Sequence, residues 1–157
     1  MKKRIVVASG YYDPIHTGHI EYLELARKYA TENYATLTVI VNNDKQAALK
    51  KGKAFMTESE RFKIVSSLRC VDDVILAIDN DPSVCATIEH LAKTHEVVAF
   101  AKGGDRFSSE IPEAGVCKAH GIVLVDGMGL KIQSSSSLIA AAASTDAPTP
   151  KPIIAPK

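Results

Sequence analysis

RIVVASGYYDPIHTGH, residues 4–19, is the most informative stretch of the sequence for the architecture. Its first part, Arg4 to Ser9, is a short apolar run rich in β-branched side chains, which predicts a strand buried on both faces. Gly10 ends that run, and from Gly18 to Ala30 the apolar residues recur at helical spacing. The stretch therefore predicts a buried strand that passes through a polar turn into an amphipathic helix.

Strands and helices continue to alternate along most of the chain. Apolar runs predict four further strands, at Leu37–Val41, Val74–Ile78, Val97–Ala101 and Ile122–Val125. Helices are predicted between them, with a last helix after Ser134. Such alternation predicts an α/β, Rossmann-like fold, which is an open parallel sheet of about five strands with helices on both faces.

Local signals predict where two of the helices begin. Thr57 and Glu60 match a capping box, with Thr57 as the N-cap and the Glu60 side chain reaching back to it. Asp81 is predicted to be the N-cap of the next helix, and Pro82 its first residue. The basic stretch 45–53, which a glycine interrupts, is predicted to be a loop or a short helix.

Length and composition fit one globular domain. The chain has 157 residues, of which 46% are hydrophobic and 24% are charged, and these values are typical of a folded domain. We expect this domain to span residues 1–143 and the segment 144–157, rich in proline and alanine, to be a disordered tail or linker. The net charge of +1 gives no bulk attraction to nucleic acid or to an anionic membrane, so we expect neither as a partner.

The cysteines and the apolar runs predict a soluble cytoplasmic protein. The three cysteines are widely spaced and form no CxxC pair, so neither a disulfide framework nor a cysteine zinc site is predicted. No apolar run approaches the roughly 18 residues that a membrane helix needs. We predict no metal ligand among the side chains.

Polar or cationic segments follow four of the predicted strands. The carboxyl ends of parallel strands share one edge of the sheet, where ligands bind in folds of this type, so these segments are the candidate site. They are residues 10–19, 42–53, 102–106 and 131–137. Glycines, hydroxyls and cationic side chains predominate in them, which suits a ligand that carries several phosphates.

His16-Thr17-Gly18-His19 lies where the first strand turns into the first helix. A helix N-terminus offers free amides and a partial positive charge to a phosphate, and both imidazoles can donate an N–H. Taken alone, two histidines at this spacing also fit an ordinary polar turn or half of a metal site. Neither a GxGxxG motif after the first strand nor a GxxxxGK[ST] loop is present, which argues against dinucleotide-binding dehydrogenases and P-loop kinases.

Four segments, in order, resemble the nucleotidyltransferase superfamily that carries the HxGH motif. GYYDPIHTGH, residues 10–19, is similar to the family's GxFDxxHxGH, with Tyr12 in place of phenylalanine. KKGKAFMTESER, residues 50–61, is similar to the lysine loop and following helix of glycerol-3-phosphate cytidylyltransferases. KGGD, residues 102–105, resembles the adenylyltransferase domains of ADP-heptose synthases, and IQSSSS, residues 132–137, resembles the family's closing ISxxT motif. The likeness covers residues 4–140.

The resemblance implies a role for most polar residues of these segments. His16 and His19 would contact the nucleotide phosphates and stabilise the transition state, and Lys50 would neutralise the α-phosphate or the acceptor phosphate. Asp13 and Lys53 would bind the acceptor substrate. The residues that would bind the nucleotide are Tyr11, Tyr12, Gly18, Lys102, Gly103, Asp105, Gln133, Ser134, Ser135 and Ser136.

The implied reaction transfers a nucleoside monophosphate, with CMP favoured, from a nucleoside triphosphate to a small acceptor that bears a phosphate or phosphonate, and it releases pyrophosphate. Mg²⁺ would accompany the triphosphate, and the family suggests a homodimer. Lys131 stands where cytidylyltransferases of this type carry an arginine. Two alternatives are adenylyl transfer to a sugar 1-phosphate and a nucleotide-binding module without turnover.

Overall fold

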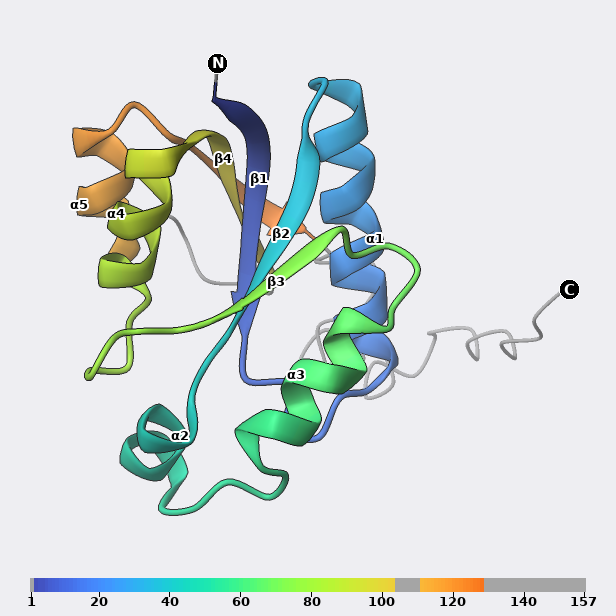
Figure 1. Ribbon diagram of the computed structural model, residues 1–157, viewed down its shortest axis with the longest axis vertical. Coiled ribbons are helices and arrows are strands. Elements are labelled where there is room, and N and C mark those ends of the chain that lie inside the picture. The colour runs from blue at the N-terminus through green and yellow to red at the C-terminus, as the bar shows by residue number, and fades with distance from the viewer. Residues whose placement is uncertain (1, 104–110, 129–157) are drawn as a thin grey trace, which may run out of the picture.

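Five parallel strands form one sheet, ordered β3-β2-β1-β4-β5, in the computed structural model, which describes residues 2–103 and 111–128 (Figure 1). The strands are β1 (Lys3–Gly10), β2 (Thr36–Val41), β3 (Asp73–Leu76), β4 (His95–Gly103) and β5 (Val123–Met128). The helices are α1 (Thr17–Glu32), α2 (Asp44–Lys51), α3 (Glu58–Ser66), α4 (Cys85–Thr94) and α5 (Glu113–Ala119). The α/β, Rossmann-like fold expected from the sequence is therefore confirmed.

Strand β1 occupies the middle of the sheet because its residues can be buried on both faces. Ile5, Val6, Val7 and Ala8 are all 0% exposed, and the strand pairs with β2 along one edge and β4 along the other. Successive side chains point to opposite faces. Val6 and Ala8 accordingly join one apolar core, and Ile5 and Val7 join the other.

Helices cover both faces of the sheet (Figure 1). Helices α1 and α3 contribute Leu23, Ala26 and Val65 to the core on one face. Helices α4 and α5 contribute to the core on the other face, where Ile88 and Cys117 are buried. Helix α2 covers neither face and lies beyond the carboxyl end of β2, so it borders the edge where the sequence analysis expects the site (Figure 1). No helix within the described ranges is long and apolar enough to cross a membrane.

The predicted start of α4 is wrong by about one turn. The Asp81 carboxylate accepts hydrogen bonds from the backbone N–H and the hydroxyl of Ser83, at 2.9 and 2.7 Å, so it closes a local turn instead of capping a helix. The carboxylate of Asp79 accepts from the backbone N–H groups of Ala86 and Thr87, at 2.6 and 3.1 Å. That carboxylate therefore satisfies the free amides of a helix that begins at Cys85.

The capping prediction for α3 is half right. The Thr57 hydroxyl accepts from the Glu60 N–H at 3.3 Å, so Thr57 is the N-cap as expected. The reverse bond from the Glu60 side chain is not formed. The neighbouring carboxylate of Glu58 instead accepts from the backbone N–H of Asp44 at 2.8 Å, which joins the first turns of α2 and α3. The basic stretch 45–53 lies largely in α2, whose C-cap is Gly52 with a φ of +85°.

Candidate functional site

The candidate site lies at the carboxyl ends of β1, β2 and β4. The chain runs from β1 to β2 on one side and then crosses from β3 to β4 on the other side of β1. Sheets of this type bind ligands at such a reversal of strand order. Tyr22 of α1 ties the two central strands together here, because its hydroxyl donates to the Ala101 carbonyl at 2.6 Å and accepts from the Ser9 N–H at 3.1 Å.

His16 and His19 form a stacked pair at the N-terminus of α1. Their ring centroids are 4.0 Å apart, with 36° between the ring planes. The Nδ1 atom of each ring accepts a backbone hydrogen bond, from Gly18 N–H to His16 and from His16 N–H to His19, both at 3.1 Å. An Nδ1 that accepts carries no proton, so the proton of each neutral ring is on Nε2. Both rings can thus donate an Nε2–H to a ligand.

His19 is a neutral donor in the folded chain at neutral pH. Burial of the ring and the neighbouring charge of His16 lower its pKa from 6.5 to about 4. A neutral imidazole donates one N–H without the desolvation cost of a buried charge. His19 therefore supplies a hydrogen-bond donor but no positive charge at neutral pH.

Tyr12 is the internal support of this turn. It is 1% exposed and has a φ of +53°, a left-handed conformation that aromatic residues rarely adopt. A Cβ built on Gly10 would approach its ring carbon Cζ to 2.8 Å, and its ring meets His19 edge-on at 5.0 Å between centroids. Its hydroxyl is buried and has no hydrogen-bond partner among the described residues. The placement of Tyr12 assigns it to packing beneath His19, whereas the sequence resemblance implies contact with the nucleotide.

Asp13 joins the histidine turn to the segment that follows α2. Its carboxylate is 0% exposed and accepts from the N–H groups of Phe55 and Met56, at 2.8 and 2.6 Å, and from Lys51 Nζ at 2.9 Å. Burial pushes the pKa of Asp13 upward, but the hydrogen bond from Lys51 and the two amides outweigh it, so the pKa lies below its ordinary value. Both carboxylate oxygens are thus used within the chain, and the predicted contact of Asp13 with a substrate remains a prediction.

The predicted lysines differ in their surroundings. Lys50 Nζ lies 4.9 Å from the centroid of the Tyr11 ring, a cation–π contact at the edge of the site. Lys51, which the sequence analysis does not select, is the lysine that pairs with Asp13. Lys53 is exposed beyond the end of α2. The sequence cannot distinguish adjacent lysines on a short helix, because the helical phase that separates them depends on where the helix begins.

The remaining predicted nucleotide-binding residues are only partly covered by the structure. Gly103 ends β4 next to Tyr22, and a Cβ there would lie 3.0 Å from that ring. Lys102 donates from Nζ to the Gly103 carbonyl at 3.1 Å. Outside the described residues lie Asp105, Gln133, Ser134, Ser135 and Ser136, together with Lys131, the predicted last helix and the segment 144–157.

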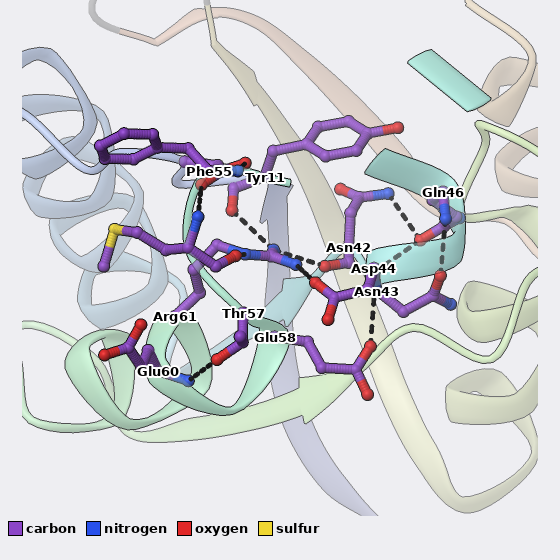
Figure 2. A network of polar contacts seen from close by, with 12 residues as sticks. Tyr11, Asn42, Asn43, Asp44, Gln46, Phe55, Thr57, Glu58, Glu60 and Arg61 are labelled. Carbon is purple, nitrogen blue, oxygen red and sulfur yellow. Dashed lines mark hydrogen bonds and ion pairs between the residues drawn. The ribbon is translucent and has the colours of Figure 1, made fainter. Parts of the chain in front are cut away.

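Arg61 is the residue of this region that the sequence analysis misses. It is 0% exposed, and its guanidinium donates to the carbonyls of Tyr11, Asn42 and Met56 and to the carboxylate of Asp44 (Figure 2). It is the last residue of the segment 50–61 that resembles the family, but the sequence analysis gives it no role, because an arginine in the first turns of an amphipathic helix is usually exposed.

This arrangement suits the binding of a polyphosphate. Two Nε2–H donors lie at the N-terminus of α1, and the ammonium of Lys50 lies over the ring of Tyr11 in the turn that leads to that helix. Among residues 2–103 and 111–128 no group of three histidine, cysteine, aspartate or glutamate side chains is arranged to hold a metal ion.

Comparison with known proteins points to the same family as the sequence resemblance, across most of the chain. The profile of the cytidylyltransferase-like family matches residues 7–140. A bifunctional protein HldE from Streptomyces coelicolor is 32% identical over 143 residues, which are 88% of this chain and 28% of that protein. An FAD synthase from Methanocorpusculum labreanum is 29% identical over 141 residues, which are 88% of this chain and 94% of that protein. The chain thus spans about a quarter of the HldE proteins it matches and nearly all of that FAD synthase.

One solved structure supports the fold. The crystal structure of a lipopolysaccharide core biosynthesis protein from Thermoplasma volcanium matches with a TM-score of 0.60 and 24% identity, over 81% of this chain and 95% of that one.

Proposed function

Because the chain belongs to the cytidylyltransferase-like family of nucleotidyltransferases, we propose that it transfers a nucleoside monophosphate from a nucleoside triphosphate to a small acceptor that bears a phosphate or phosphonate. The observation that carries the proposal is the pair His16 and His19, whose Nδ1 atoms accept from backbone amides, so that the proton each neutral ring can donate to a ligand is on Nε2. A pair held in this way matches the need to stabilise charge on a phosphate in transfer.

The reaction needs donors and alignment more than it needs a base. An acceptor oxygen attacks the α-phosphorus, a new P–O bond forms, and the bond from the α-phosphorus to the bridging oxygen breaks. Pyrophosphate leaves with that electron pair. The acceptor oxygen is already anionic at neutral pH, so no proton has to be removed. Lys50 is a candidate to neutralise charge on the acceptor or the α-phosphate.

Mg²⁺ is proposed as part of the triphosphate substrate. It would neutralise charge on the phosphates and polarise them for attack, and phosphate oxygens and water would supply most of its ligands. The carboxylate of Asp13 is already bonded to two amides and to Lys51, so both of its oxygens have partners within the chain before any metal binds.

The donor base is the open choice within this proposal. An FAD synthase covered over 94% of its length and the HldE proteins are among the relatives, and FAD contains an adenylyl group. We therefore put ATP first as the donor, with a phosphate-bearing acceptor such as a flavin mononucleotide or a sugar 1-phosphate. CTP is the second candidate, because the lysine segment 50–61 resembles that of glycerol-3-phosphate cytidylyltransferases. A homodimer is a further expectation, which light scattering of the purified chain checks.

Pyrophosphate release is the direct test. The chain is incubated with Mg²⁺, with ATP or CTP, and with a panel comprising flavin mononucleotide, sugar 1-phosphates, glycerol 3-phosphate and an alkyl phosphonate. We expect release with one donor–acceptor pair and a nucleotide-linked product by mass spectrometry. His16→Ala and His19→Ala should lower kcat by about 10²–10³, the usual effect of losing one transition-state donor. His90→Ala, an exposed histidine of α4, is the matched control.

Two results would contradict the proposal. One is tight nucleotide binding with no turnover across the panel, which favours a binding module. The other is near-normal kcat in both histidine variants.

A further inference from the structure

We propose that Arg61 is a positioning residue, which fixes the helix bearing Lys50 and Lys51 against the turn bearing His16 and His19. The inference rests on the proposed nucleotidyl transfer and adds to it a residue that touches no substrate.

Arg61 joins three separate segments of the chain from a fully buried position. Nε donates to the Met56 carbonyl at 2.9 Å, and Nη1 donates to the carbonyls of Tyr11 and Asn42, at 2.9 and 2.6 Å. Nη2 donates to Asp44 Oδ1 at 2.7 Å (Figure 2). These acceptors follow β1, follow β2 and precede α3, so one guanidinium sets the distances among three of the loops at the carboxyl edge of the sheet.

The chemistry of the contacts requires an arginine. Three of the four acceptors are main-chain carbonyls, and a planar guanidinium presents donors to them at fixed angles, whereas a lysine offers one point charge. Stability alone does not explain a buried charge, because well-packed apolar residues of similar volume often give an equal free energy of unfolding. The arrangement is therefore better explained by the geometry that it imposes on the backbone.

Helix α2 is held at both ends by this system. At its first residue, the Asp44 carboxylate binds Arg61 and the Asp44 N–H binds Glu58. At its last residue, Lys51 Nζ binds the side chain of Asp13 at 2.9 Å and the Asp13 carbonyl at the same distance. Lys50 is six residues after Asp44, roughly 9 Å along the axis at 1.5 Å per residue. Because the helix is so short, a displacement of either end also displaces Lys50.

A second connection reaches Lys50 through Tyr11. The Tyr11 carbonyl accepts from Arg61, and the Tyr11 ring lies 4.9 Å from Lys50 Nζ. Arg61 thus fixes the backbone of the aromatic residue on which Lys50 rests. Tyr11 is two residues before Asp13, so the same turn also carries the far anchor of α2.

Misplacement of α2 should affect the transition state more than nucleotide binding. Displacement of a catalytic group by about 1 Å can lower a rate about 10²-fold. We expect Arg61→Lys, in the full chain, to lower kcat about 10²-fold while the Kd for the nucleotide changes less than threefold. Asp44→Asn should lower kcat about tenfold with the same unchanged Kd. Asp73→Asn, which removes an exposed ion pair with Lys3 at the opposite end of the sheet, should change neither.

Amide hydrogen exchange gives a second readout, which does not need activity. The N–H groups of Phe55 and Met56 bind Asp13, so a loosened segment should exchange at least tenfold faster in Arg61→Lys, with exchange at Ala101 in β4 unchanged. Faster exchange at all three sites instead means general destabilisation and overturns the inference.

The remaining outcomes also decide. A folded Arg61→Lys protein with kcat within threefold of the parent overturns the inference. If that variant does not fold by circular dichroism, Asp44→Asn carries the test, and an unchanged kcat there overturns it. A parent chain that never releases pyrophosphate defeats the proposed function, and hydrogen exchange then still decides whether Arg61 positions the segment.

Discussion

The two ends of the sheet use charge in opposite ways. At the carboxyl end, Arg61 and the carboxylate of Asp13 are 0% exposed and every bond they make is internal. At the amino end, the ion pair between Lys3 and Asp73 joins side chains that are 53% and 54% exposed, and Arg4 pairs with Glu96 in a similar setting. Exposed pairs contribute about 0–1 kcal/mol and tolerate movement, whereas buried, fully bonded charges specify one geometry. The buried, fully bonded charges lie at the carboxyl end of the sheet, where the proposed reaction takes place.

The largest expected effect comes from removing the buried charge. Arg61→Met leaves three main-chain carbonyls and the Asp44 carboxylate without the fully buried guanidinium that binds them, so we expect the free energy of unfolding to fall by about 3–5 kcal/mol. Urea denaturation followed by circular dichroism measures it. A loss below about 1 kcal/mol would mean that the buried charge contributes no more to stability than the exposed ion pairs at the amino end, and would contradict this comparison.

Tight packing at the carboxyl end gives the next largest effect. In Gly10→Ala the new Cβ would lie 2.8 Å from Tyr12 Cζ, so the buried ring must shift, and we expect a loss of about 1–3 kcal/mol. Thermal unfolding of both proteins measures this loss. Gly115→Ala in α5 is the control: nothing lies within 4 Å of the added atom, and the change should raise stability by about 0.5–1 kcal/mol. Equal effects at the two positions would show that Tyr12 is not held against Gly10.

The neutral state of His19 predicts a pH dependence of stability. Its pKa is about 4 in the folded chain and near 6.5 when unfolded, so the unfolded chain binds more protons between these values. The free energy of unfolding should therefore fall as the pH drops from about 6.5 to 4, and above 6.5 this contribution is complete. The change is modest because the ring is partly exposed.

Urea midpoints between pH 4 and 7 check this prediction, with His19→Gln expected to flatten the dependence and His90→Gln to preserve it. An identical slope in His19→Gln would assign the effect to other groups. A direct titration of the His19 ring by NMR supplies the pKa itself.

The smallest effect is expected at the amino end. Asp73→Asn removes the partner of Lys3 in an ion pair of 3.0 Å, and we expect the free energy of unfolding to change by at most about 1 kcal/mol, less at high salt. Urea midpoints at low and high salt measure it. A cost that rivals Arg61→Met would mean that both ends depend equally on their charges.

The sequence predicts the elements of this fold better than the contacts between them. Apolar runs and helical spacing identify the five strands that the described residues form and the turn that bears His16 and His19, since those signals are local. The predicted start of α4 is too early because Asp81-Pro82 has the pattern of a helix start. The carboxylate that binds the first amides of α4 belongs instead to Asp79, seven residues before Ala86. Arg61 is missed because its partners, such as Tyr11, lie up to 50 residues away, and no local pattern encodes them.

The central place of β1 has a consequence for synthesis of the chain on the ribosome. Its partner strand β4 is far along the sequence, with Arg4 beside Glu96, 92 residues later. A nascent chain can pair β1 with β2 early, but the other edge of an apolar strand stays open until β4 has emerged. Such an edge recruits further strands. Chains that terminate before His95 should therefore aggregate during translation and depend on chaperones. Chains that extend through β4 cover this edge of β1 and should aggregate less.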